Sequence, residues 1–330
     1  MSYTQVLTTV LHSPVKKRAV VSPVIYVLLG GLVLYFMWRD VDLLVTLRKC
    51  DNRNVTQDLT VTSVKSLLQP PTIHYLELPL SEVMELELGL SSFVSPNFVS
   101  YTGVLIGLTA ALLICHNRRL LILTGVTLYK LRDLADSLDG VLARGAGVAM
   151  LPTPGTSGYY IDGWCDIISE TALIYSVGVV ILREREKSWQ GVRTSSKSLW
   201  SPSGLRAQLA TLCAPLTMNI WGLGLQSILA AVGWNWTTSQ LHLLLEAGVT
   251  PSSHVQGPQG LTSPLAGLVV FLWRLLNPHM LTQALLVSLT LDRPGQWVEL
   301  TRLVVTLPLL VTCVASYILV YSLRHQQNNL

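Results

Sequence analysis

The chain has 330 residues, of which 50% are hydrophobic and only 13% are charged, and its mean hydropathy is +0.47. A soluble domain typically carries about 25% charged residues, so this composition excludes a chain that is water-facing over its whole surface. The net charge is only +4, and no interleaving of basic and aromatic residues supports nucleic-acid binding. The composition therefore predicts an all-α, polytopic membrane protein.

The N-terminal part is predicted to hold a signal anchor and then a more polar segment. An apolar run over 23–38 follows the basic cluster 16–18, and no small-residue cleavage site comes after it. Residues 1–40 are thus predicted to be a cytosolic tail and an uncleaved anchor helix. Residues 41–95 would be luminal, and their second half, 75–90, mixes glutamates with leucines as a helix lying along the bilayer does.

The rest of the chain, 96–325, is predicted to form a six-helix catalytic core. Pro96 suits the first turn of a helix, where its missing N–H costs nothing. A basic, polar connection is expected over 183–206 and a polar loop over 233–262. The apolar runs that define the six helices are 97–115, 120–143, 158–182, 208–231, 265–289 and 298–323.

The distribution of positive charge predicts the orientation of these helices. Basic residues mark the cytosolic side, which places 16–18 and 183–206 in the cytosol. The loop 233–262 contains no Lys or Arg and falls on the luminal side. The two sequons, at Asn54 and Asn235, fall on that side too and are candidate glycosylation sites.

Four aspartates in two neighbouring helices carry the chemistry. Asp136 and Asp139 are three residues apart and Asp162 and Asp166 are four apart, so each pair shares one face of its helix. An antiparallel helix pair joined by the loop 145–157 would bring the four carboxylates together. Such a cluster needs cations, and oxygen ligands without His or Cys suit Mn²⁺ or Mg²⁺. Two such ions form a clamp for displacement at phosphorus.

Acids inside a membrane also serve as proton relays, so a metal or proton transporter is the alternative from another class. The chain has no inverted repeat of the kind that many transporters have. Gly140 and Ala143 leave room for a ligand beside the helix backbone, and Arg144 offers a fork to a diphosphate. These residues favour an enzyme.

The pattern D-x-x-D-G-x-x-A-R…G-x-x-x-D-x-x-x-D is similar to the signature of the CDP-alcohol phosphotransferases. Ser95-Pro96-Asn97 also resembles the motif with which the core of that family begins, and the resemblance covers residues 75–325. It implies a six-helix core, two divalent ions, and Asp166 as general base. It implies metal ligation by Asp136, Asp139, Asp162 and Asp166, and binding of the cytidine-diphosphate donor by Asn97, Asp136, Gly140, Ala143, Arg144 and Gly158.

Three departures point to one branch of the family. Thirteen residues separate Arg144 from Gly158, more than the usual pattern has; the active face is predicted to be luminal; and an N-terminal anchor is present. In these features the chain is most similar to the invertebrate ceramide phosphoethanolamine synthases of the Golgi membrane. That resemblance implies CDP-ethanolamine as donor, ceramide as acceptor, and Mn²⁺ rather than Mg²⁺. Diacylglycerol stays open as the acceptor, choline stays open in place of ethanolamine as the headgroup, and a homodimer stays open as the assembly.

Other ionisable residues near the motif are expected to have supporting roles. Asp133 is expected to pair with the basic residues beside it, and Glu170 is a candidate for contacts just behind the metal ligands. Arg274 and His279 lie within an apolar run, where charge is costly unless it faces the interior. They are candidates either for holding a phosphate or headgroup or for helix packing around Pro278.

Overall fold

The computed structural model describes residues 31, 35–36, 38–39, 68–145, 157–193, 202–246 and 263–328. Contacts divide the chain into two units, Met1–Leu43 and Leu44–Leu330, and the helices described below all belong to the second. Most of the predicted anchor lies outside the described residues, as does Asn54. The predicted division of the chain into three parts therefore stays a prediction.

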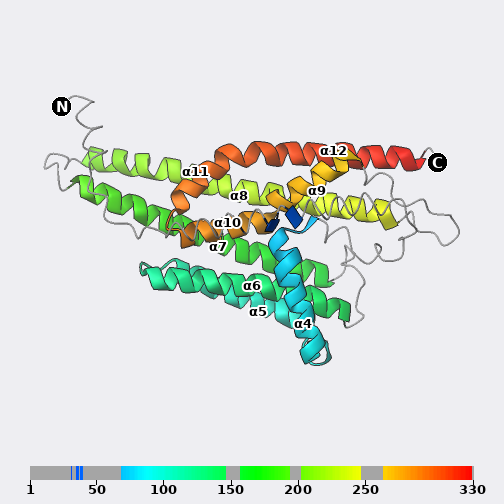
Figure 1. The fold of residues 1–330 in the computed structure, drawn as a ribbon. Coiled ribbons are helices and arrows are strands. Elements are labelled where there is room, and N and C mark those ends of the chain that lie inside the picture. Colours follow the sequence, from blue (N-terminus) through cyan, green and yellow to red (C-terminus); the bar gives the residue numbers. More distant parts are fainter. Residues whose placement is uncertain are drawn as a thin grey trace. The chain divides into compact units, whose positions relative to one another are not determined.

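Every regular element in the described part of the second unit is a helix, which confirms the all-α prediction (Figure 1). In chain order the elements are η1 (a π-helix, Ile73–Glu77), α4 (Leu78–Leu88), η2 (a 3₁₀ turn, Leu90–Ser92), α5 (Pro96–Ile114), α6 (Arg119–Gly145), α7 (Ser157–Arg193), α8 (Pro202–Glu246), α9 (Pro264–Leu276), α10 (Pro278–Thr290), α11 (Pro294–Val304) and α12 (Thr306–Asn328).

Several of these helices are long and apolar enough to cross a membrane, which agrees with the prediction of a polytopic membrane protein. Among the described residues, these stretches are Pro96–Ile114, Tyr160–Glu184, Pro264–Thr290 and Thr306–Gln326. The predicted span 120–143 is absent from this set. Its second half carries several charged residues, which α6 directs toward neighbouring helices, as shown below.

Helices α5 and α6 lie side by side and α7 packs against α5, which sets the frame of the site (Figure 1). Small residues allow the close approach. A Cβ added to Gly125 of α6 would lie 2.7 Å from the carbonyl oxygen of Ala110 in α5. One added to Gly107 of α5 would lie 3.0 Å from Oγ of Ser169 in α7. Larger residues at these two glycines would push the three helices apart.

The apolar core is built as two main clusters. One joins α8, α9 and α12 around Trp273, which is fully buried and donates from Nε1 to Oγ of Ser316 at 2.8 Å. The other joins α5, α6 and α7 to α10 and α11, with Leu173 and Val177 of α7 fully buried at its centre. The second cluster includes residues of α6 and α7, the helices that carry the aspartates, and packs them against α5.

The predicted helix over 265–289 is broken in two at Asn277. Pro278 has no N–H to donate to the preceding turn, so α9 stops and α10 starts anew. Asn277 adopts an extended conformation, and its Oδ1 accepts from the backbone N–H of Met280 at 2.8 Å, which caps α10. The last predicted helix, 298–323, is likewise divided into α11 and α12.

Two of the predicted connections are partly wrong because the helices extend further. The polar loop expected over 233–262 is helical as far as Glu246, since Trp234, Thr237 and Leu241 form a buried stripe at helical spacing. The basic connection expected over 183–206 is helical up to Arg193, where α7 ends.

Candidate active site

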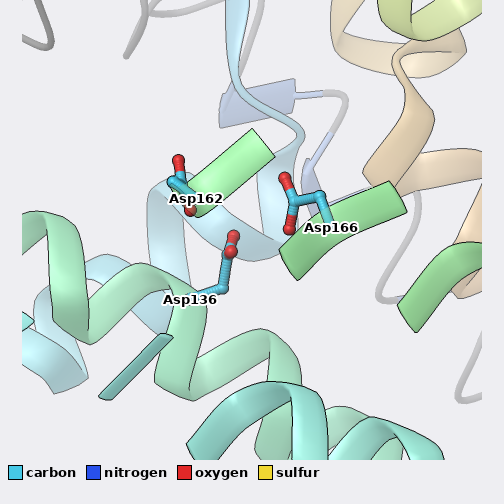
Figure 2. Close-up of side chains that lie close together, drawn as sticks. All are labelled: Asp136, Asp162 and Asp166. Carbon is cyan, nitrogen blue, oxygen red and sulfur yellow. The ribbon is translucent and has the colours of Figure 1, made fainter. Parts of the chain in front are cut away.

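Three of the predicted aspartates converge at the meeting point of α6 and α7. Asp136 comes from α6, and Asp162 and Asp166 lie one turn apart on α7. Figure 2 shows their carboxylates pointing toward one another, and one oxygen from each lies within 4.8 Å of the other two. Each residue is partly exposed, so the cluster is open to a ligand. The four-residue spacing on α7 brings Asp162 and Asp166 together, and the packing of α6 and α7 against α5 brings Asp136 to them.

The chemistry of this donor set fits a hard divalent cation. The three groups supply only carboxylate oxygens, which are the ligands that Mg²⁺ and Mn²⁺ prefer. Three like charges this close also repel one another unless a cation lies among them. The residues present thus suit the kind of ion that the sequence predicts, although they do not distinguish one ion from the other.

Asp139 does not belong to this group of three. Its Oδ2 accepts a hydrogen bond from Oγ of Ser100 on α5 at 2.5 Å, and its side chain is buried. A step of three residues turns a helix by about 300°, so Asp139 is displaced around α6 from Asp136 toward α5. The sequence placed both on one face; the structure separates their carboxylates while keeping them on the same turn.

A buried arginine that the sequence analysis did not assign to the site lies among the acids. The guanidinium of Arg132 pairs with Asp166 and lies 3.5 Å from Asp136 and 3.4 Å from Asp133. Its side chain is only 7% exposed and passes over Gly107, whose added Cβ would lie 3.6 Å from Cγ of Arg132. One fixed positive charge thus neutralises part of the cluster. The signal in the sequence was its position one turn before Asp136.

A second ion-pair group links the site to the segment before the core. Lys130 of α6 lies 2.7 Å from Oε1 of Glu77 in η1 and 3.0 Å from Oδ2 of Asp133. The prediction that Asp133 pairs with its basic neighbours is confirmed, since Lys130 and Arg132 both contact it. Burial raises the pKa of Glu77 despite the nearby Lys130. The ion pairs run without a break from Glu77 to Asp166.

The predicted donor-binding residues lie at the starts of α5 and α7 and along α6. A Cβ added to Gly158 would lie 3.9 Å from Oδ1 of Asn97, so these two helix starts adjoin. A Cβ added to Gly140 would have only Nη1 of Arg144 near it, at 3.6 Å. Ala143 is partly exposed and Arg144 is exposed. This side of α6 therefore has free surface beside small residues, as a bound diphosphate requires.

The remaining candidates, Glu170, Arg274 and His279, contact residues of neighbouring helices. Glu170 accepts hydrogen bonds from Thr282 and Ser227. Arg274 is fully buried with its guanidinium 5.6 Å from the centre of the Tyr75 ring, and His279 packs edge-on against Trp234. These contacts favour helix packing for Arg274 and His279.

Comparison with known proteins identifies the family of the chain. The family model for ceramide phosphoethanolamine synthase matches residues 45–325. The chain is 27% identical to the ceramide phosphoethanolamine synthase of Drosophila melanogaster over 255 residues, which cover 73% of this chain and 63% of that protein. The resemblance inferred from the aspartate motif is confirmed. Because the matched residues make up most of its length, the chain belongs to the ceramide phosphoethanolamine synthase family.

Proposed function

We propose that this chain transfers phosphoethanolamine from CDP-ethanolamine to the primary hydroxyl of ceramide, giving ceramide phosphoethanolamine and CMP. The observation that carries the proposal is the convergence of Asp136, Asp162 and Asp166 within 4.8 Å, beside the small residues of the signature. The family to which the chain belongs, and the name of its Drosophila relative, support this choice of substrates.

The acids and small residues would divide the work between binding and chemistry. Asp136, Asp162 and Asp166 would hold a divalent ion, with Asp139 as a further ligand if its bond to Ser100 opens; two ions, Mn²⁺ or Mg²⁺, are our proposal. When bound, such ions stabilise negative charge on the phosphoryl oxygens. Gly140 and Ala143 would let the donor diphosphate approach the backbone of α6. Asn97, Gly158 and Arg144 would complete the donor site.

Asp166 would act as the general base. Its carboxylate takes the proton of the ceramide primary hydroxyl as that oxygen forms a bond to the β-phosphorus. The bond from this phosphorus to the bridging oxygen breaks, and its electron pair leaves with CMP. The ion pair with Arg132 supports this role, because the guanidinium holds the carboxylate in a fixed orientation.

The orientation and compartment are part of the proposal. Lack of Lys and Arg in 233–262 favours a luminal active face, and the branch resemblance favours the Golgi membrane with Mn²⁺. Asn235 is exposed on α8, but the hydroxyl of Thr237 is buried and donates to the carbonyl oxygen of Gly233 at 2.8 Å. We therefore propose Asn54 as the first sequon to test for glycosylation.

The test is CMP release by the purified chain with Mn²⁺ and CDP-ethanolamine, supplied in parallel with ceramide or diacylglycerol. Release with ceramide alone supports the proposal. Release with diacylglycerol alone would change the acceptor and keep the reaction class, while ion flux without CMP release would support a transporter.

The role of Asp166 is tested with the substitution Asp166→Asn, which removes the base but keeps the shape of the side chain. We expect CMP release to fall by about 100-fold or more, as for loss of a general base. Asp292→Asn is a matched control, because Asp292 is exposed at a turn with φ 59°, a conformation that asparagine tolerates. Full activity in Asp166→Asn would refute the mechanism.

A further inference from the structure

Glu170 is an acid within a membrane-spanning stretch that the proposed reaction does not use. It lies in Tyr160–Glu184, one helical turn after Asp166. One of its oxygens accepts from Oγ1 of Thr282 in α10 at 2.7 Å and the other from Oγ of Ser227 in α8 at 3.2 Å. An acid at such a depth is costly and calls for a function or a firm partner. Here the partners are two neutral hydroxyls and no basic residue contacts it directly in the described part of the chain.

The carboxylate of Glu170 has acceptor capacity left. An ionised carboxylate can accept about four hydrogen bonds, and two are used by Thr282 and Ser227. Glu170 is also only partly buried. A donor that reaches it from the membrane side would therefore find free lone pairs, with no need to displace either hydroxyl.

A small pocket adjoins this carboxylate at the junction of α7, α8, α10 and α11. Its volume is about 20 Å³, enough for one water molecule or one hydroxyl group. Apolar side chains form much of the wall, and the polar residues in it are Glu170, Gln226, Ser227 and Thr301. The amide of Gln226 is occupied by the carbonyl oxygen of Thr301 and by Thr306. Glu170 is thus the charged group that a hydroxyl in this pocket would meet.

The distance between the two acids suits two neighbouring groups of one lipid. Four residues of α-helix span about 6 Å along the axis, so Glu170 lies about that far from Asp166 and deeper in the membrane. A sphingoid base carries its primary hydroxyl and its 3-hydroxyl on nearby carbons, followed by the alkyl chains. Diacylglycerol has ester oxygens in place of the second hydroxyl, and these only accept hydrogen bonds.

We propose that Glu170 determines the choice of acceptor lipid. The 3-hydroxyl of the sphingoid base occupies the pocket and donates a hydrogen bond to the carboxylate of Glu170. Asp166 takes the proton of the primary hydroxyl. Diacylglycerol would set an ester oxygen against this carboxylate and leave its remaining lone pairs without a donor. Sites built to bind a hydroxyl reject analogues that lack it far more strongly than apolar pockets reject a change of size. This inference rests on the proposed function.

The test compares three acceptors with the full chain in detergent micelles: ceramide, 3-deoxyceramide and diacylglycerol. For the wild type we expect kcat/KM for ceramide to exceed that for 3-deoxyceramide by about 10-fold to 100-fold, the range for a hydrogen bond to a charged group. In Glu170→Gln we expect kcat/KM for ceramide to fall by a similar factor and that for 3-deoxyceramide to change little. Glu87→Gln, in an exposed position on α4, is the matched control.

The outcomes separate this inference from the one on which it rests. If the wild type releases no CMP with ceramide or 3-deoxyceramide, the proposed function fails and the inference with it. If the wild type uses ceramide and 3-deoxyceramide equally well, the proposed function stands and the role of Glu170 is refuted, whether or not the variant folds. An equal loss on both lipids in Glu170→Gln would show that Glu170 only holds α7, α8 and α10 together.

Discussion

Arg132→Met tests whether one buried guanidinium holds the acid cluster together. The substitution keeps most of the side-chain stem that lies over Gly107 but removes the charge that contacts Asp133, Asp136 and Asp166. Without the guanidinium, Asp133, Asp136 and Asp166 each lose a positive charge that lies within 3.5 Å of them. We therefore expect a large loss of stability in the absence of divalent ions.

The magnitude follows from the geometry. At 3.5 Å and an effective dielectric constant of 20, a unit charge pair attracts by about 4–5 kcal/mol. The cost of desolvating Arg132 offsets part of this, and losing one partner of a buried pair typically costs about 3–5 kcal/mol. For a chain of this size we expect the unfolding temperature to fall by about 5 °C or more.

The assay is thermal unfolding of purified protein in detergent, with a chelator or with saturating Mn²⁺. Removing Arg132 leaves the carboxylates more negative, so Mn²⁺ should raise the unfolding temperature more in the variant than in the wild type. Arg118→Met, at an exposed position between α5 and α6, is the matched control and should change little. The reasoning is refuted if Arg132→Met unfolds at the wild-type temperature in chelator.

Two further predictions concern packing and pH. Gly125→Ala should destabilise the protein by about 1–3 kcal/mol, because its Cβ would meet a backbone oxygen at 2.7 Å; Gly224→Ala, with nothing within 4 Å, is the control. An unchanged unfolding temperature in Gly125→Ala would show that α5 and α6 can separate freely. For Glu77, burial raises the pKa above 4.5, with Asp133 acting in the same direction and Lys130 against it. Ionised Glu77 is thus less favourable in the folded than in the unfolded state, so its contribution to stability is lost as pH rises from below 4.5 through the folded pKa. Across that pH window Glu77→Gln should gain stability relative to the wild type, and a difference in unfolding temperature that does not change with pH would contradict this.

The sequence predicted the acids of the site because local spacing is enough to place them. Asp162 and Asp166 are four residues apart, and this step alone puts both on one face of α7. Asp136 joins them because α6 and α7 both pack against α5, whereas the sequence analysis expected these two helices to form a pair joined by the loop 145–157. The position of Asp139 depended on which helix covers its side of α6, and only the structure supplies Ser100 there.

What the sequence could not supply comes from contacts between distant segments. Arg132 looked like one of several charges at the end of an apolar helix, and its ion pair with Asp166 spans 34 positions in the chain. The helical extension to Glu246 was missed because polar residues hid the buried stripe of Trp234, Thr237 and Leu241. By contrast, the break at Asn277 had a visible signal in Asn-Pro, which both ends one helix and caps the next.

Because of the break at Asn277, the span Pro264–Thr290 consists of two helices that can bend relative to each other. Pro278 removes one N–H from the ladder of hydrogen bonds, and the cap of α10 comes from a side chain, so the two halves are held by few shared bonds. The α9 half is anchored in the cluster around Trp273, while the α10 half carries Thr282 beside Glu170. If the bilayer tilts α9, we therefore expect the bend at Asn277 to change while α10 keeps its position. The carboxylates of α6 and α7 would then keep their spacing.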